Sequence, residues 1–331
     1  MAITISGSGI TSANIADGTI TTDDINSSDV SSLKSGRKNL IINGAMRVQQ
    51  RGTASVTSGY FVDRFQLSGG SASAVLTSST PTEFPTAISV SATSGNPIVI
   101  QKIESESCQH LSGQTVTASF YAKNISNATT LYAKLVYAGS VDNFGSSTTI
   151  SEQNLGALSG SWVKYTASWT VPSGGLNGLM LNILCDGTST FTMGVTGIQL
   201  ELGSVATDFE HRSYGEELAL CKRYFEKSYS ANIAPGTSGN FDGDVEIRGN
   251  TLDVSSLSGP FRFSVEKRAT PTVTLYSPDN GATGTINRYA SGTPVSITGI
   301  QHLGTNAFAR VLAPVVADAP YRFHWTADAE L

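Results

Sequence analysis

Hydrophobic and polar positions alternate in short runs along most of this chain, and turn residues separate the runs. The clearest run, WVKYTASWTVP at 162–172, alternates large and polar side chains, as a strand with one buried face does. Similar strand patterns begin near residues 98, 115, 131, 179 and 195. About eight such strands, with no long helical pattern between them, predict a jelly-roll β-sandwich over residues 38–212. The expected fold class is therefore all-β.

A single helical pattern interrupts the strands, and it begins at Ser213. This residue can cap a helix, and Glu216 follows three positions later, as in a capping box. We predict a connector helix over residues 213–227 and a smaller C-terminal β-sandwich over residues 228–331. Strand patterns within that second sandwich lie at 261–265, 271–276, 308–313 and 321–327.

Residues 1–37 are rich in Ser, Thr, Asp and Gly, but an aliphatic residue recurs at every fifth position: Ile10, Ile15, Ile20, Ile25 and Val30. This period matches neither the helix nor the strand. One thin aliphatic line cannot bury itself within a single chain, so we expect several copies to associate around an axis. The segment would then be an extended stalk, or the attachment of the chain to a larger particle. A flexible polar leader is the alternative.

The charge content narrows the possible partners. Charged residues make up 14% of the 331 residues, compared with about 25% in typical soluble chains. The net charge of −5 argues against nucleic acid, because phosphate binding needs clustered Lys and Arg. No apolar stretch reaches the roughly 18 residues of a membrane span, and residues 1–15 do not resemble a signal peptide. We therefore expect no membrane insertion.

Neither the cysteines nor the acidic residues form a recognisable metal site. The cysteines lie far apart without zinc-site spacing, and we expect them to be buried apolar side chains in a protein folded in a reducing cytoplasm: Cys108, Cys185 and Cys221. Acidic residues alternate over 240–246, which could hold Ca²⁺ in a Gly-rich loop. A solvated acidic edge that blocks unwanted strand pairing is the favoured interpretation. We predict no metal.

The sequence also lacks a recognisable catalytic arrangement. Its four histidines form no HxH or HExxH pattern, and no serine lies in a GxSxG turn. A polysaccharide depolymerase would need two carboxylates facing one groove. Nothing in the sequence pairs the available acids, which include Glu104, Glu106, Glu201 and Asp208. We therefore expect a protein that is not an enzyme and has no cofactor.

Several segments resemble phage tail-fibre proteins. The runs NLIINGAMRVQQRG (39–52) and GYFVDRFQL (59–67) resemble the start of a domain common in these fibres, and GIQLELGSVATDFEHRSYGEELALCKRYF (197–225) resembles its exit. The run FSVEKRATPTVTLYSPDNG (263–281) and the ending HWTADAEL are similar to their terminal domain, and SANIADGTITTDDI (12–25) to their polar leaders. The resemblance implies a virion component that is homotrimeric and has a jelly roll similar to carbohydrate-binding modules.

Loops at the far end of a fibre are a natural place for receptor contacts, because loops tolerate variation. We predict that four residues of Gly-, Ser- and Thr-rich stretches in the C-terminal domain contact a host-surface glycan: Asn287, Arg288, Tyr289 and His302. An ordinary polar loop is the alternative. The hypothesis is a trimeric tail fibre of the virion, attached through residues 1–37 to a tail or baseplate protein. A capsid decoration or tail adaptor without receptor binding is the second interpretation, and a depolymerase tailspike is the third.

Overall fold

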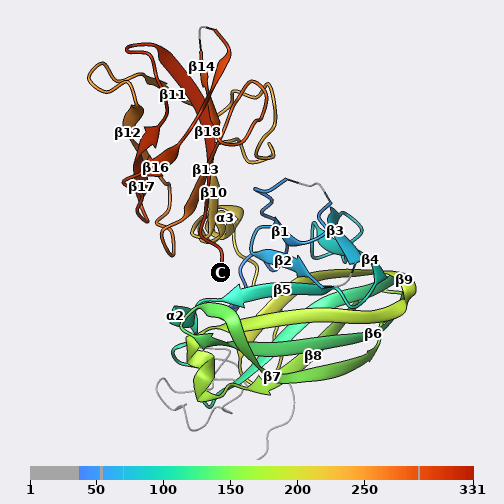
Figure 1. Cartoon of the computed structure of the whole chain (residues 1–331). Coiled ribbons are helices and arrows are strands. Elements are labelled where there is room, and N and C mark those ends of the chain that lie inside the picture. The colour runs from blue at the N-terminus through green and yellow to red at the C-terminus, as the bar shows by residue number, and fades with distance from the viewer. Residues whose placement is uncertain (1–36, 53–54, 70, 290) are drawn as a thin grey trace, which may run out of the picture.

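The computed structural model describes residues 37–52, 55–69, 71–289 and 291–331, which form two β domains joined by a short helix (Figure 1). The predicted all-β chain with β-sandwich sheets is confirmed. The five predicted attachment residues lie outside the described residues: Ile10, Ile15, Ile20, Ile25 and Val30.

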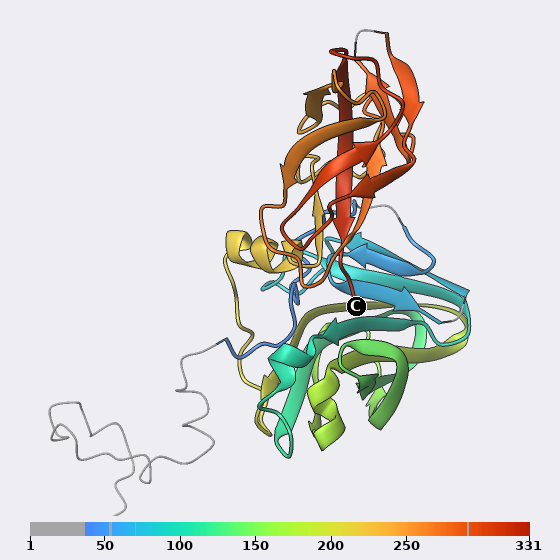
Figure 2. The ribbon, with the colours of Figure 1, turned by 60° about the vertical axis from the view of Figure 1, so that its left-hand side comes forward.

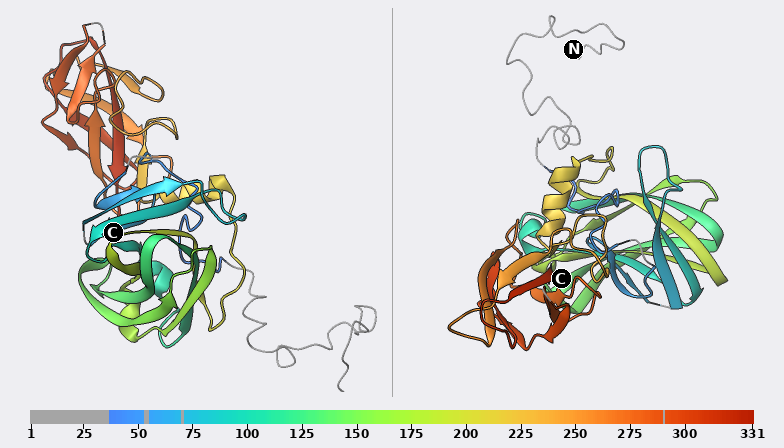
Figure 3. Two further views of the ribbon diagram at one scale, coloured as in Figure 1. Left: turned by 90° about the vertical axis from the view of Figure 1, so that its right-hand side faces the viewer. Right: turned by 90° about the horizontal axis from the view of Figure 1, so that it is seen from above.

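The N-terminal domain contains nine antiparallel strands and two short helical turns. The strands are β1 (Gly59–Val62), β2 (Phe65–Ser68), β3 (Ser71–Thr77), β4 (Ala87–Ser94), β5 (Ile98–Ile103), β6 (Thr115–Ser140), β7 (Asn143–Ala157), β8 (Val163–Thr170) and β9 (Leu179–Leu202). The turns are α2 (Ser105–Cys108) and the 3-10 helix η2 (Ser173–Asn177). The sheet folds into two layers because the long β6 and β9 run through both (Figure 3). Strands β1, β2, β5 and β7 complete one layer, and β3, β4 and β8 complete the other.

Alternate positions of these strands fill the core between the layers. On β8, Ala167 and Trp169 are buried whereas Thr166 and Thr170 are exposed, as the sequence pattern predicted. All three cysteines are buried, which confirms that expectation. Burial raises the pKa of the Cys221 thiol well above its ordinary value, so this thiol is unsuited to act as a nucleophile.

Two of the segments that resemble phage fibres, 39–52 and 197–225, lie side by side, although their hydrogen-bonded residues are more than 150 positions apart. Leu40 N donates to Leu200 O at 2.8 Å, and Ile198 N donates to Gly44 O at 3.0 Å. A Cβ atom at Gly44 would lie 2.0 Å from the carbonyl oxygen of Ile198, so only glycine permits this approach. The first and last segments of the domain are therefore joined by backbone hydrogen bonds.

The connecting helix α3 (Tyr214–Lys222) begins where the sequence predicted, because Ser213 Oγ accepts a hydrogen bond from Glu216 N at 3.3 Å. The predicted extent of 213–227 is wrong at its far end. Residues Phe225–Lys227 form strand β10, which pairs with the last strand of the chain. Long-range strand pairing here outweighs the local helical pattern. The C-terminal domain thus begins at Phe225 rather than at residue 228.

The C-terminal domain packs a six-stranded sheet against a three-stranded sheet (Figure 2). The larger sheet contains β10, β11 (Val245–Arg248), β13 (Thr272–Tyr276), β14 (Thr285–Arg288), β15 (Thr293–Ser296) and β18 (Pro320–Asp328). The smaller sheet contains β12 (Ser256–Arg262), β16 (Gly299–Gln301) and β17 (Ala307–Leu312). Strand β18 is central, because it pairs with β10, β11, β13 and β14. Aromatic rings fill the core, among them Phe261, Phe263, Phe308 and Trp325.

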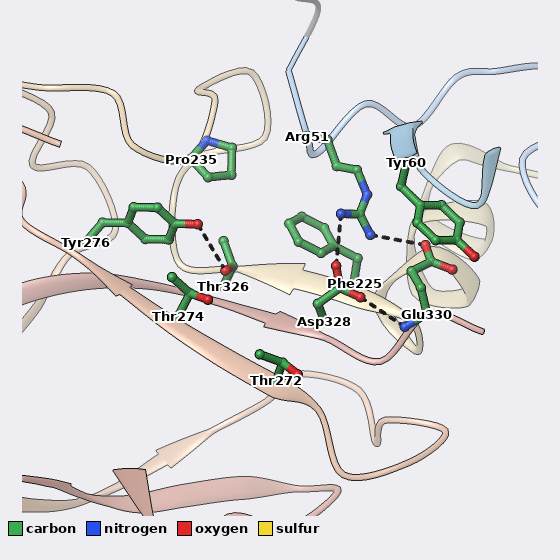
Figure 4. Close-up of a pocket in the computed structure, with 10 residues that line it drawn as sticks. All are labelled: Arg51, Tyr60, Phe225, Pro235, Thr272, Thr274, Tyr276, Thr326, Asp328 and Glu330. Atoms are coloured by element: carbon green, nitrogen blue, oxygen red, sulfur yellow. Dashed lines mark hydrogen bonds and ion pairs between the residues drawn. The ribbon is translucent and has the colours of Figure 1, made fainter. Parts of the chain in front are cut away.

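The two domains are held together by charged groups at the end of β18 (Figure 4). Arg64, with a side chain only 1% exposed, forms an ion pair with Glu330 and stacks on Tyr224 at 3.4 Å from the ring centre. Arg51 binds Glu330 at 3.2 Å and Asp328 at 3.1 Å. Two arginines of the N-terminal domain therefore share one glutamate of the C-terminal domain.

We expect Arg64→Met to lower the free energy of unfolding by about 3 kcal/mol or more, because removing one partner of a buried ion pair leaves the other charge poorly compensated. Chemical denaturation monitored by circular dichroism measures this change. The matched control is Arg248→Met, since the Arg248–Asp318 pair is 66% and 74% exposed. An exposed pair contributes less than about 1 kcal/mol. Equal effects of the two substitutions would contradict a structural role for the buried cluster.

Candidate functional site

The outer face of the six-stranded sheet carries polar residues at every second position of β18. Strand alternation directs one set of side chains into the core, namely Tyr321, Phe323, Trp325 and Ala327. The opposite face carries Arg322, His324, Thr326 and Asp328. The segment 229–244 crosses this face, because Tyr229 stacks on His324 and Phe241 lies over Arg322. This segment divides the face into two ends. One end lies at the domain junction, and the other lies farther away, beside β14 (Figure 1).

We call this far end the distal site and define it by Phe241, Asp279, Asn287, Tyr289 and Arg322. The Arg322 guanidinium lies 4.2 Å from the ring centre of Phe241 and 4.7 Å from that of Tyr289. Both rings are about half exposed, at 46% and 51%. Arg322 also forms an ion pair with Asp279. A cation thus fixes two aromatic rings at the surface in defined positions.

On the strand next to Arg322, a buried polar atom lacks a partner. The side chain of Asn287 is buried, and its Nδ2 donates to the Asp279 carboxylate. Within the described residues, Asn287 Oδ1, Arg288 Nε and Arg322 Nε have no hydrogen-bond partner in the protein. Buried polar atoms are normally satisfied by protein, by water or by a ligand. Of these atoms, Asn287 Oδ1 and Arg322 Nε belong to the distal site, whereas Arg288 pairs with the core residue Tyr321 and faces the other side of the sheet. The distal site therefore contains one unpartnered acceptor and one unpartnered donor beside its aromatic rings.

The charges around Arg322 have both signs. Partial burial raises the pKa of Asp244, the neighbouring Glu246 and Asp279 also raise it, and Arg322 lowers it. Glu246 of β11 and Asn287 of β14 flank Arg322 on the two sides of β18. Carboxylates, an amide and a guanidinium are therefore gathered within one surface. Such a set can bind hydroxyl groups as well as compensate a charge.

His324 fixes the segment that carries Phe241. Its Nε2 is 3.1 Å from Asn240 O, and its Nδ1 is 2.9 Å from Ser228 Oγ. Ser228 Oγ also accepts from Trp325 N at 3.0 Å. The neutral ring with a proton on Nε2 satisfies all three contacts, because Ser228 can then donate to Nδ1. Burial lowers the pKa of His324, while the contact with Asn240 and the charge of Asp242 raise it.

Three of the four predicted contact residues are consecutive in the chain, and the fourth lies elsewhere. Of the three, Arg288 pairs with the core residue Tyr321 and faces the side of the sheet opposite to Asn287. Arg288 and Tyr289 follow one another at the end of β14, and Tyr289 is exposed. Asn287 is not in a loop as predicted: it is 1% exposed and pairs within the sheet with β15 and β18. Backbone pairing on both sides explains why this Ser- and Thr-rich stretch is a strand.

His302 lies in the turn after β16, in the smaller sheet, with a φ of 55°. This turn is near the domain junction, because Lys267 N donates to Thr305 O and Lys267 Nζ donates to Lys222 O of α3. Tyr289 N instead donates to Pro320 O at the distal start of β18. The nine residues of β18 span about 30 Å between these two ends. His302 therefore does not form one site with Tyr289.

Sequence reasoning missed three residues of the distal site, namely Phe241, Asp279 and Arg322. The alternation of Arg322 and His324 with Phe323 and Trp325 places the first two on one face, which was readable from the sequence. The contact of Arg322 with Phe241 joins positions about 80 residues apart, and no local pattern reports it. The acidic stretch 240–246 contributes Asp244 and Glu246 to this surface. Within the described residues, no group of three or more His, Cys, Asp or Glu side chains could hold a metal ion.

No helix in the described part of the chain is long and apolar enough to cross a membrane. No protein-family model matches the sequence, and no curated protein matches it.

Several solved structures are similar to about half of this chain, at low identity. The enzymatically active domain of tailspike protein 4 from bacteriophage CBA120 is 16% identical, with a TM-score of 0.37, over 50% of this chain and 21% of that one. The module TmCBM61, solved with β-1,4-galactotriose, is 11% identical, with a TM-score of 0.35, over 50% of this chain and 99% of that one. The CBM22-1 xylan-binding domain of Paenibacillus barcinonensis Xyn10C is 14% identical, with a TM-score of 0.33, over 52% of this chain and 100% of that one. Identities this low assign neither ligand nor activity.

We expect acidification to loosen residues 240–244. The folded protein resists protonation of His324, whereas the unfolded chain binds a proton near pH 6.5, so the unfolded state binds more protons below that pH. Stability therefore falls as the pH is lowered from about 6.5 towards the pKa of the folded state. Protection factors of residues 240–244 at pH 7 and pH 5, in which the exchange rate is divided into the intrinsic rate at the same pH, measure the loosening.

The variant His324→Gln removes the titrating group and should flatten this pH dependence. The exposed His302 provides the control, because His302→Gln should leave the loss of protection at pH 5 unchanged. If protection over 240–244 fell equally in His324→Gln and in the unmodified protein, His324 would not be the responsible group.

Proposed function

We propose that this chain is a glycan-binding protein that attaches a phage tail to a bacterial surface through the distal site. One observation carries the proposal: the Arg322 guanidinium lies 4.2 Å and 4.7 Å from the centres of two half-exposed rings, Phe241 and Tyr289. The residue paired with Arg322 on the neighbouring strand is buried Asn287, whose Oδ1 has no partner among the described residues. Apolar faces of sugar rings stack on aromatic side chains, and sugar hydroxyls need amide, carboxylate and guanidinium partners beside them. The distal site supplies both kinds of contact.

The position of the distal site also supports attachment to a surface. It lies beside β14, at the end of the C-terminal domain that is farthest from the N-terminal sandwich (Figure 1). A large receptor such as a capsular polysaccharide or lipopolysaccharide can reach that end without meeting the rest of the chain. The mixed charge of the site suits sugar units that carry hydroxyl groups together with an occasional acidic group.

The tail-fibre part of the proposal is supported by the resemblance of residues 39–67 and 197–225 to phage fibres. We infer that residues 1–37 attach to a tail or baseplate protein and that the chain is a homotrimer in the virion. Weak sugar contacts become strong when three linked sites engage one surface. Strand β7 gives a further reason for association. Its 15 residues pair only with β6 among the described strands, and such a long free edge is unusual for a monomer.

We propose that the chain binds its glycan without cleaving it. The buried carboxylates named in the sequence analysis are occupied, since Glu104 forms an ion pair with Arg223 and Glu201 accepts hydrogen bonds from Thr207. Glu106 is exposed and also lies near Arg223. This arrangement favours structural roles for the three acids. Release of reducing ends from a bound polysaccharide would support a depolymerase instead.

We expect the purified chain to bind selected members of an array of bacterial capsular polysaccharides and lipopolysaccharides, and Tyr289→Ala to weaken that binding about tenfold. An aromatic contact contributes about 0.5–1.5 kcal/mol, and 1.4 kcal/mol corresponds to a factor of ten. Biolayer interferometry with the selected polysaccharide measures the affinity.

The matched control is Tyr214→Ala, because Tyr214 is a tyrosine of α3 with a similar exposure of 40%. It should bind like the unmodified chain. If the unmodified chain bound nothing on the array, glycan binding would be refuted. If Tyr289→Ala and Tyr214→Ala had equal affinities, the glycan would bind elsewhere.

We expect light scattering to give a mass near three chains for the full chain and for the fragment 38–331, because the contacts between copies would then lie in the β domains. A trimeric full chain with a monomeric fragment would place the contacts in residues 1–37. A monomeric full chain at micromolar concentration would refute the trimeric fibre.

A further inference from the structure

The opposite end of the same sheet face contains a pocket of about 590 Å³ at the domain junction (Figure 4). Thr272, Thr274 and Tyr276 of β13 line it together with Thr326 and Asp328 of β18. The volume falls within the roughly 300–1,000 Å³ of small-molecule sites. The segment 229–244 separates this junction pocket from the distal site, because Tyr229 and His324 stack between them.

The lining presents hydroxyl groups in a regular array. Thr274 is paired with Thr326, and Thr272 with Asp328, so two adjacent rungs of the β13–β18 ladder face the pocket. Such rungs are about 7 Å apart along the strand, and the two strands are about 5 Å apart. Within the described residues, no protein group hydrogen-bonds to the hydroxyls of Thr272 and Thr274, and Tyr276 Oη is 3.5 Å from Thr326 Oγ1. These hydroxyls can each donate and accept.

The charges around the pocket disfavour an anionic ligand. The Arg51 guanidinium is bound to Asp328 and Glu330 and lies 3.8 Å from the ring centre of Phe225. Its charge is thus compensated within the wall, and because Arg64 also pairs with Glu330, the two arginines and the two acids balance. Asp328 remains 38% exposed and can accept further hydrogen bonds. The ring of Tyr60 completes this side of the pocket.

We propose that the junction pocket binds a segment of a neutral oligosaccharide. Sugar hydroxyls would bond to Thr272, Thr274, Thr326 and Asp328, and a sugar ring would stack on Tyr276. This second site goes beyond the receptor site proposed above and does not depend on it. Arg51 and Tyr60 come from the N-terminal domain, whereas the hydroxyls come from the C-terminal domain. The walls of the pocket therefore come from both domains, and the proposed sugar contacts come from the C-terminal domain.

The test titrates the full chain with neutral malto-, xylo- and galacto-oligosaccharides of three to six units, by isothermal calorimetry and saturation-transfer NMR. We expect at least one series to bind. The double variant Thr274→Val/Thr326→Val retains the shape of both side chains and removes two hydroxyls. It should weaken binding at least tenfold, since each lost hydrogen bond contributes about 1 kcal/mol. The control Thr166→Val removes an exposed strand hydroxyl of β8 and should bind normally.

A second measurement locates the ligand. Bound oligosaccharide should slow hydrogen exchange in β1 and in β10 together, because the pocket walls come from both domains. Absence of binding by any neutral series would refute the proposal. So would unchanged affinity in the double variant, or protection of peptides around Tyr289 alone. Loss of binding in Tyr289→Ala but not in the double threonine variant would place the sugar at the distal site instead.

Discussion

The buried cluster of Arg64, Glu330 and Arg51 is the constraint on which the arrangement of the whole molecule depends. Burying three charged groups costs solvation energy, and their pairing recovers it only when the geometry is good. That geometry requires the end of β18 to lie against the loop and first strands of the N-terminal sandwich. The orientation of one domain on the other is therefore specified by directional contacts rather than by apolar burial alone. The wall of the junction pocket exists only in this orientation, because Arg51 and Tyr60 belong to the other domain.

Strand β18 determines which polar residues lie on the outer face of the C-terminal domain. The side chains of β18 alternate between the two faces of the sheet. One set completes the aromatic core, and the other set, Arg322, His324 and Thr326, lies on the outer face. His324 then has a double role: it supports the segment that carries Phe241, and with Tyr229 it separates two surfaces of different chemistry. The distal surface combines aromatic rings with both signs of charge. The junction pocket combines hydroxyls with a compensated arginine, so the two ends would select different sugars.

Features with a local cause were predictable from the sequence. Alternation on β8 gave Trp169 its buried position, and the Ser213 cap gave the start of α3. Features that depend on distant partners were not. The helical pattern continues to residue 225, but pairing with β18 turns Phe225–Lys227 into a strand. The sequence around Asn287 predicts a loop. In the structure Asn287 lies in a strand, because β15 and β18 pair with it on either side. Asn287, Arg288 and Tyr289 are consecutive in the sequence, so their proximity needed no prediction, and their role in binding stays a prediction. The contacts of Arg322 with Phe241 and Asp279 join distant positions, so no short-range rule reports them.

The course of β18 has a mechanical consequence. The strand runs from the distal site to the domain junction, and four neighbouring strands are hydrogen-bonded along its length. Hydrogen bonds of an antiparallel ladder are perpendicular to the strands. A pull between a bound surface and the N-terminal domain is therefore directed along the strand, so it shears many hydrogen bonds at once instead of opening them one after another. If the chain tethers a particle as proposed, this ladder resists tension in the direction in which that tension acts.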